Sequence, residues 1–270
     1  MNSLTDIRCF LLDMDGTFYL GDRLLPGSLA FMRYLAASGR DHLFLTNNSS
    51  RDAGHYAAKL AGMGWPSGRE SILTSGEATA LYLKQQQPGA RIFLLGTADL
   101  EAEFSAHGFS LTADRPDYVV LGFDKTLTYD KLTTACRLIR SGTPFIATHP
   151  DFNCPTEDGY IPDCGAMIEF IVASTGVRPY IIGKPHRDIV AAVFAKKPYR
   201  PHELAIVGDR LYTDIATGKS AGIVSILVLS GETTAADLDK AEVRPDFVFA
   251  GLGELAAALA AGDRLQANNT

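Results

Sequence analysis

Short apolar runs alternate with amphipathic segments along almost the whole chain. Residues 8–13 (RCFLLD) and 42–48 (HLFLTNN) are apolar runs of the length that buried strands have. Residues 28–39 and 52–64 carry apolar side chains at helical spacing, and each segment ends at a glycine. Continuous apolar strands separated by such helices predict βαβ units around a mostly parallel sheet, which is an α/β fold.

The alternation continues to the end of the chain, but the turn residues between the segments differ in its middle part. From about Gly76 to Pro179 the strand-like and helix-like segments have different turn residues between them, and residues 149–165 form a turn-rich stretch without periodicity. A loop of that length in a compact domain is usually functional or disordered. After Pro179 the segments again resemble those of the first part of the chain.

Composition and charge exclude several classes of function. The chain has 270 residues, 46% of them hydrophobic and 21% charged, with a net charge of −6 and no basic block. The absence of a basic block argues against nucleic acid as a partner. Because the net charge is negative, an anionic substrate would have to be attracted by local positive groups or a metal. No apolar run approaches the ~18 residues of a membrane span, and the N-terminal run is too short for a signal peptide. We expect no membrane partner, a cytoplasmic location and four reduced cysteines.

Polar side chains follow four of the predicted strands, at the point where each strand ends. They are Asp13 and Asp15, Thr46 and Asn47, Lys184, and Asp209 with Asp214 five residues later. A single aspartate in such a place is usually a helix cap or part of a turn. Because the carboxyl ends of parallel strands meet at one edge of a sheet, the whole set predicts a ligand site there.

The acidic residues of this set suggest a metal and a reaction. Asp13, Asp15 and Asp209 gathered in a crevice would repel one another unless a cation joined them. Carboxylate oxygens without histidine or cysteine suit Mg²⁺, which shares its coordination with phosphate groups. With Lys184 nearby, the pattern predicts phosphoryl transfer, with Asp13 as the nucleophile and Asp15 as the general acid and base.

Four short motifs, DMDGT, TNN, GKP and GDRLYTD, occur in this order at the ends of these strands. In this order they resemble the motifs of the haloacid dehalogenase superfamily of phosphohydrolases, most closely its NagD-like, para-nitrophenylphosphatase branch. The resemblance implies a doubly wound, Rossmann-like core formed by residues 1–78 and 180–270. It implies an inserted α/β cap of the C2 type at residues 79–179, which would close over the phosphate site and select the leaving group.

The resemblance also implies a role for each residue of the motifs. Asp13 would bind Mg²⁺ with its side chain and Asp15 with its backbone carbonyl; Asp209 would hold the metal, with Asp214 supporting it. The Thr46 hydroxyl and the amides near Asn47 would bind phosphate, and Lys184 would neutralise the nucleophile and the phosphate.

Three residues of the turn-rich stretch, His149, Asp151 and Asp163, are candidates for contact with the leaving group. Ordinary roles in turns are an equally good interpretation of them. The resembling branch often has asparagine where His149 stands, so contact with the leaving group could differ here.

The function expected from the sequence is Mg²⁺-dependent hydrolysis of a small phosphomonoester through an aspartyl phosphate. Nucleotide monophosphates, sugar phosphates, phosphoglycolate and para-nitrophenyl phosphate all fit a capped site. The alternatives are a phospho-acceptor signalling module, which would lack an acid at position 15, and a carbon–halogen hydrolase, which would need no Mg²⁺. The resemblance leaves open a homodimer formed between caps.

Overall fold

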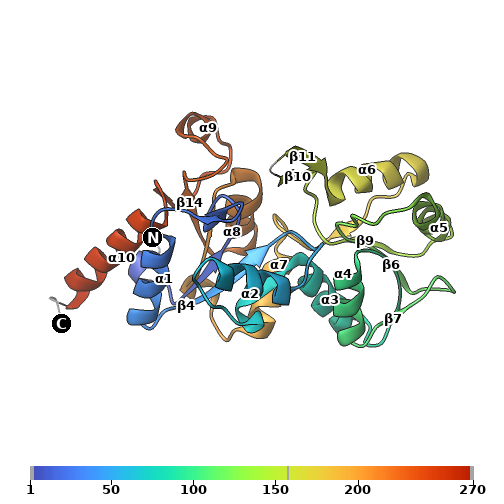
Figure 1. The fold of residues 1–270 in the computed structure, drawn as a ribbon, viewed down its shortest axis with the longest axis horizontal. Helices are drawn as coiled ribbons and strands as arrows, with labels where there is room; N and C mark the ends of the chain where they lie inside the picture. Colours follow the sequence, from blue (N-terminus) through green and yellow to red (C-terminus); the bar gives the residue numbers. More distant parts are fainter. Residues whose placement is uncertain (1–2, 157, 268–270) are drawn as a thin grey trace. The chain divides into compact units, whose positions relative to one another are not determined.

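The computed structural model describes residues 3–156 and 158–267, which form two compact units. The first unit comprises the chain up to Leu45, Ala57–Ile72 and the chain from Val193 onward. The second unit comprises Thr46–Tyr56 and Leu73–Ala192. Each unit has its own mostly parallel sheet with helices packed on it, and the predicted α/β fold is confirmed (Figure 1).

A six-stranded sheet, formed mainly by the first unit, has the strand order β15-β14-β13-β1-β4-β5; Thr46 of β4 and the last two residues of β5 belong to the second unit. Their bounds are β1 (Cys9–Leu12), β4 (Asp41–Thr46), β5 (Ile72–Thr74), β13 (Leu204–Gly208), β14 (Val224–Val228) and β15 (Phe247–Phe249). From β1 the chain moves to one side of the sheet through β4 and β5, and from β13 to the other side through β14 and β15. The strand order therefore reverses between β1 and β13, and ligands of doubly wound sheets bind at the carboxyl ends of such a pair.

The centre of this sheet is apolar because it is covered on both faces. All four residues of β1 are buried, and β13 and β14 are buried along their whole length. The helices are α1 (Ser28–Ala37), α2 (Ala53–Gly62), α7 (Asp188–Lys196), α8 (Ala216–Ala221), α9 (Ala235–Asp239) and α10 (Leu252–Ala267), with residues of α2 and α7 in both units. Helix α10 packs along α1 although the two lie at opposite ends of the chain (Figure 1).

Several shorter elements complete the first unit. A two-stranded hairpin, β2 (Tyr19–Leu20) and β3 (Arg23–Leu24), follows β1 directly. Short helical turns are η1 (Leu4–Asp6), η2 (Arg69–Ser71), η3 (Pro201–Glu203) and the π-helical η4 (Leu211–Ile215).

The second unit has a five-stranded parallel sheet in the order β12-β9-β8-β6-β7. The strands are β6 (Arg91–Leu95), β7 (Ser110–Leu111), β8 (Tyr118–Leu121), β9 (Phe145–Ala147) and β12 (Tyr180–Ile181). The helices are α3 (Ser75–Gln86), α4 (Ala98–Ala106), α5 (Tyr129–Arg140) and α6 (Cys164–Thr175). Buried Leu95, Val119 and Leu121 pack with α5 and α6 to form its core.

The turn-rich stretch at residues 149–165 contains a hairpin that the sequence does not predict. Its strands are β10 (Asn153–Thr156) and β11 (Gly159–Pro162), paired antiparallel. Most of their side chains are exposed, so the hydrophobic alternation that marks a half-buried strand is missing. Pro155 and Pro162 further hide the pattern, since proline is rare inside strands.

Candidate active site

Three aspartates come together in the first unit. Asp13 directly follows β1 and Asp209 directly follows β13, while Asp214 lies in η4. Strands β1 and β13 are parallel neighbours with Leu12 opposite Val207, so their carboxyl ends lie side by side. One carboxylate oxygen of each aspartate lies within 4.8 Å of those of the other two. The parallel pairing of β1 and β13 thus brings the predicted Asp13 and Asp209 together, with Asp214 of η4 beside them.

Asp209 is fixed in this cluster by its neighbours. The backbone N–H of Glu232 donates to Asp209 Oδ2 at 2.7 Å, and Thr17 Oγ donates to Oδ1 at 3.4 Å. A Cβ atom at Gly16 or Gly231 would collide with the Asp209 carboxylate. Glycine at these two positions lets the backbone approach the carboxylate closely.

Asp214 is also held by its neighbours and is 1% exposed. The backbone N–H of Arg210 and the hydroxyl of Thr213 donate to its Oδ2 at 3.2 and 3.3 Å. A Cβ atom at Gly208 would collide with the Asp214 side chain. The packing leaves this carboxylate little freedom to turn away from the cluster.

Asp15 lies next to the β2–β3 hairpin, and its side chain reaches solvent. The turn is closed by Gly16, whose N–H donates to Tyr19 O at 2.8 Å and whose φ is +81°. Neighbouring atoms still remove part of the water around the Asp15 carboxyl, which raises its pKa, and the positive charge of Lys59 opposes that rise. An aspartate with a raised pKa is suited to carrying a proton.

The donor set of the acidic cluster fits a hard divalent cation. Asp13, Asp209 and Asp214 offer carboxylate oxygens only, and Mg²⁺ and Ca²⁺ prefer oxygen ligands. Three carboxylates this close also repel one another, and a cation removes that repulsion. The cluster contains Asp214 in addition to the predicted Asp13 and Asp209. Asp15 is predicted to bind the metal through its backbone carbonyl, so its side-chain carboxyl need not lie in the cluster.

A second polar group lies in the second unit, around Asn47. Thr46 is the last residue of β4 and Asn47 follows it. The Asn47 side chain accepts a hydrogen bond from Lys184 N–H at 2.8 Å and donates to Lys184 O at 3.0 Å. Its Nδ2 also lies 3.1 Å from Asp151 Oδ2. The structure thus brings together two of the predicted phosphate-binding residues, Asn47 and Lys184, and the predicted cap residue Asp151.

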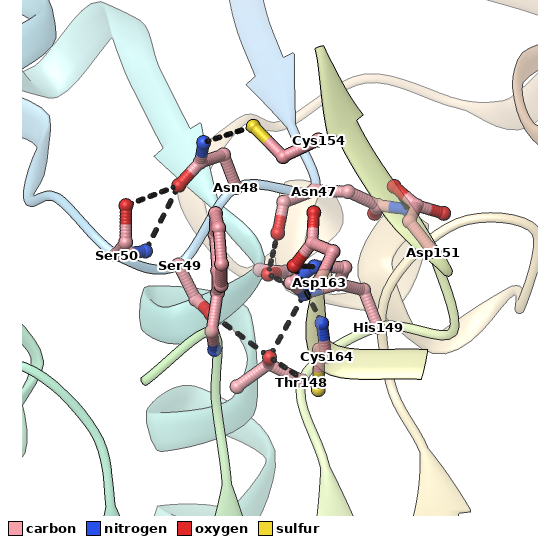
Figure 2. Close-up of polar contacts among 12 residues, drawn as sticks. Asn47, Asn48, Ser49, Ser50, Thr148, His149, Asp151, Cys154, Asp163 and Cys164 are labelled. Carbon is pink, nitrogen blue, oxygen red and sulfur yellow. Dashed lines mark hydrogen bonds and ion pairs between the residues drawn. The ribbon is translucent and has the colours of Figure 1, made fainter. Parts of the chain in front are cut away.

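The other two predicted cap residues form a buried pair (Figure 2). His149 Nε2 lies 2.9 Å from Asp163 Oδ1; His149 is 0% exposed and Asp163 4%. Asp163 also caps α6 by accepting the Cys164 N–H at 2.6 Å. Contact of these residues with a leaving group stays a prediction.

Several further polar residues hold these groups, and most of them have no signal in the sequence. The hydroxyls of Ser75 and Thr148 contact His149. Ser75 also donates to the Asn47 carbonyl, and the hydroxyl of Ser49 lies 3.0 Å from that of Thr148. In the first unit, Arg210, which lies inside the predicted GDRLYTD motif, has its Nε 2.9 Å from Glu232 Oε2, beside Asp209. Ser75 also has a recognisable signal: it follows β5 in the stretch TSGE, where Thr74 caps α3 by accepting the Glu77 N–H. Ser49 contacts Thr148 from 99 positions away, so no local pattern shows that contact.

Two family models match the chain. Residues 10–110 match the haloacid dehalogenase-like hydrolase model, and residues 181–255 match a second model for HAD-hydrolase-like proteins. The acid sugar phosphatase of Staphylococcus saprophyticus is 36% identical over 253 residues, which are 93% of this chain and 98% of that protein.

Within residues 3–156 and 158–267, every helix is too short or too polar to cross a membrane.

Solved structures of phosphatases are also similar. The 4-nitrophenylphosphatase of Thermotoga maritima is 52% identical, with a TM-score of 0.92 over 95% of this chain and 98% of that one. A glycerol phosphate phosphatase of Mycobacterium tuberculosis, solved with calcium, is 35% identical, with a TM-score of 0.87 over 94% of this chain and 76% of that one. The same protein has been solved with magnesium. The chain belongs to the haloacid dehalogenase superfamily and is a phosphatase of its NagD-like, 4-nitrophenylphosphatase type.

Proposed function

We propose that this phosphatase is Mg²⁺-dependent and hydrolyses a small phosphomonoester through an aspartyl phosphate on Asp13. The observation that carries the proposal is the cluster of Asp13, Asp209 and Asp214 carboxylates at the carboxyl ends of β1 and β13. The relatives are named for action on sugar phosphate, 4-nitrophenyl phosphate and glycerol phosphate. We extend that range of small phosphate esters to this chain.

The reaction has two steps. In the first, an Asp13 carboxylate oxygen attacks phosphorus, the bond from phosphorus to the leaving oxygen breaks, and Asp15 gives that oxygen its proton. In the second, a water oxygen attacks phosphorus while Asp15 takes up a proton from the water. The bond between phosphorus and Asp13 then breaks, which releases inorganic phosphate and restores both aspartates.

Side chains of this chain supply the charge that the reaction needs. Asp13, Asp209 and the backbone oxygen of Asp15 would hold Mg²⁺, with Asp214 behind them. Bound there, Mg²⁺ supplies positive charge to the phosphate oxygens. Hydrogen bonds from Thr46 and Asn47, and the ammonium of Lys184, would stabilise the same oxygens.

We further propose that residues 79–179 act as a cap that excludes water from the reacting phosphate and selects the leaving group. Asp151 is the first candidate in this region for contact with the substrate, because its carboxylate is partly exposed beside Asn47. A homodimer formed between caps and a cytoplasmic location stay predictions.

Phosphate release from a panel of phosphomonoesters tests the proposal. The panel includes nucleotide monophosphates, sugar phosphates, glycerol phosphate, phosphoglycolate and 4-nitrophenyl phosphate, each assayed with Mg²⁺ and with EDTA. We expect release from at least one ester with Mg²⁺ and its loss with EDTA. Failure of every ester in Mg²⁺ would overturn the proposed substrate class, and undiminished release in EDTA would overturn the metal requirement.

A further inference from the structure

A buried chain of polar groups leads from the start of α6 to the loop after β4, all within the second unit (Figure 2). His149 lies at its centre, with Nε2 2.9 Å from Asp163 Oδ1 and Nδ1 2.9 Å from Thr148 Oγ. Nδ1 is also 3.3 Å from Ser75 Oγ. The side chains of these four residues are almost entirely buried, so their hydrogen bonds are not exchanged for water.

Ser75 connects this chain to the loop that carries Asn47. Its hydroxyl donates to the backbone carbonyl of Asn47. A serine hydroxyl has one proton to donate. Any acceptor near Ser75 therefore competes with the Asn47 carbonyl for that proton.

The protonation state of His149 decides whether such a competitor exists. Neutral His149 that donates from Nε2 to Asp163 has a free electron pair on Nδ1, which accepts from Ser75 or Thr148. Protonated His149 donates from both nitrogens, so both hydroxyls become acceptors toward the ring. The proton of Ser75 then has the Asn47 carbonyl as its acceptor, and the loop is held.

A second route joins the same residues through the backbone. Asp151 lies two positions after His149 and contacts Asn47 Nδ2, while its carbonyl accepts the N–H of Gly165 at 2.8 Å. The Gly183 N–H donates to Thr148 O at 2.8 Å, directly before Lys184. A Cβ atom at Gly183 would lie 2.8 Å from Asn47 Oδ1 and 2.9 Å from His149 Cβ. The segment that carries His149 is therefore packed against both Asn47 and Lys184.

We propose that His149, paired with Asp163, is a positioning residue whose proton fixes Asn47 and Lys184 for phosphate binding, so that substrate capture weakens when His149 becomes neutral. This inference rests on the proposed function, because it assigns phosphate binding to Asn47 and Lys184. It does not require His149 to touch the substrate.

The charges around His149 favour its protonated form. Burial alone would lower the pKa of His149, but the charge and hydrogen bond of Asp163, helped by Asp151, outweigh burial and raise it; Lys184 acts in the opposite direction. The Cys164 thiol, which also lies beside Asp163, stays neutral because burial raises its pKa to about 12. Two acids thus face His149, against one lysine.

The test compares pH profiles of kcat/KM for 4-nitrophenyl phosphate between the wild type and His149→Gln, in saturating Mg²⁺. The ratio of the two profiles cancels the titration of the substrate and of groups that both proteins share. We expect the wild type to exceed the variant by about fivefold or more at pH 6. That advantage should shrink at alkaline pH, mainly through KM. His107→Gln, at the end of α4, is the matched control and should follow the wild type.

A second variant separates positioning from simple loss of structure. Asp163→Asn keeps an acceptor for the Cys164 N–H but removes the negative charge from His149. We expect its alkaline decline in kcat/KM to begin at lower pH than in the wild type. If His149→Gln does not fold, this shift and the titration of His149 followed by NMR decide the matter.

The outcomes distinguish this inference from the proposed function. A wild type without activity on any phosphomonoester would overturn the proposed function. An active wild type whose ratio to His149→Gln is the same at all pH values would overturn the inference alone. So would an Asp163→Asn profile that coincides with that of the wild type.

Discussion

Asn47 and Lys184, 137 positions apart in the sequence, exchange two hydrogen bonds between the side chain of one and the backbone of the other. The amide of Asn47 uses both of its ends, since Oδ1 accepts the Lys184 N–H and Nδ2 donates to the Lys184 carbonyl. Both residues are buried. The side chain of Asn47 therefore fixes the backbone from which Lys184 projects.

Asn47→Ala should destabilise the protein and weaken substrate binding together. The substitution leaves the buried Lys184 N–H and C=O without their partner, which costs about 1–3 kcal/mol for each unsatisfied group. Urea unfolding measures the loss of stability, and KM for 4-nitrophenyl phosphate measures the binding. Asn153→Ala, at an exposed position of β10, is the control and should change neither. Unchanged stability and KM in Asn47→Ala would show that the pair with Lys184 is dispensable.

Gly16→Ala should lower the affinity for Mg²⁺. The new Cβ would collide with the Asp209 carboxylate, and φ at this position is +81°. We expect the Mg²⁺ concentration for half-maximal activity to rise about tenfold, a coupling of the size common between neighbouring sites. A left-handed backbone at alanine also costs about 1–2 kcal/mol of stability.

The control for this substitution is Gly64→Ala. Gly64 has a φ of +89°, but a Cβ atom there meets nothing within 4 Å. It should lose similar stability and keep the Mg²⁺ dependence of the wild type. Equal Mg²⁺ requirements in the two variants would contradict the role of Gly16 in leaving room for Asp209.

The pair of His149 and Asp163 makes stability depend on pH. The pKa of His149 in the folded protein is raised above the value of about 6.5 in the unfolded chain. A group whose pKa is raised on folding adds its full stability below the unfolded pKa and loses it as pH rises through the folded pKa. The free energy of unfolding should therefore fall above pH 6.5 in the wild type. The free energy of unfolding of His149→Gln should fall less over the same pH range. Parallel pH dependences of the two proteins would argue against a protonated His149.

The sequence is sufficient to predict the acidic part of the site but not the network around Asn47. Cys9–Leu12 and Leu204–Gly208 are apolar throughout, so their strands and the acids that follow them are readable from the pattern. For His149, in a turn-rich stretch, the sequence predicts contact with the leaving group or an ordinary role in a turn. In the structure it is buried and forms hydrogen bonds with Asp163 and with Ser75, which is 74 positions away, and no local pattern predicts such contacts.

Asp15→Asn should slow the reaction unequally for different substrates. Alkyl phosphates have poor leaving groups that need a proton, whereas nitrophenolate leaves without one. We expect kcat for glycerol phosphate to fall at least about tenfold more than kcat for 4-nitrophenyl phosphate. Equal losses for both esters would remove Asp15 from the role of general acid.

Asp13→Asn should abolish turnover without unfolding the protein. An amide cannot attack phosphorus in place of the carboxylate, and loss of a nucleophile typically costs at least about 10³-fold in kcat. Thermal unfolding should show a cooperative transition like that of the wild type. Substantial residual hydrolysis by this variant would place the nucleophile on another residue.

The most direct measurement is the site of covalent phosphorylation during turnover. Wild-type protein is mixed with ³²P-labelled substrate and Mg²⁺, quenched in acid within the first turnover, digested and mapped by mass spectrometry. The label should lie on the peptide that contains Asp13, and it should be absent from Asp13→Asn. Label on any other residue would contradict an aspartyl phosphate at Asp13.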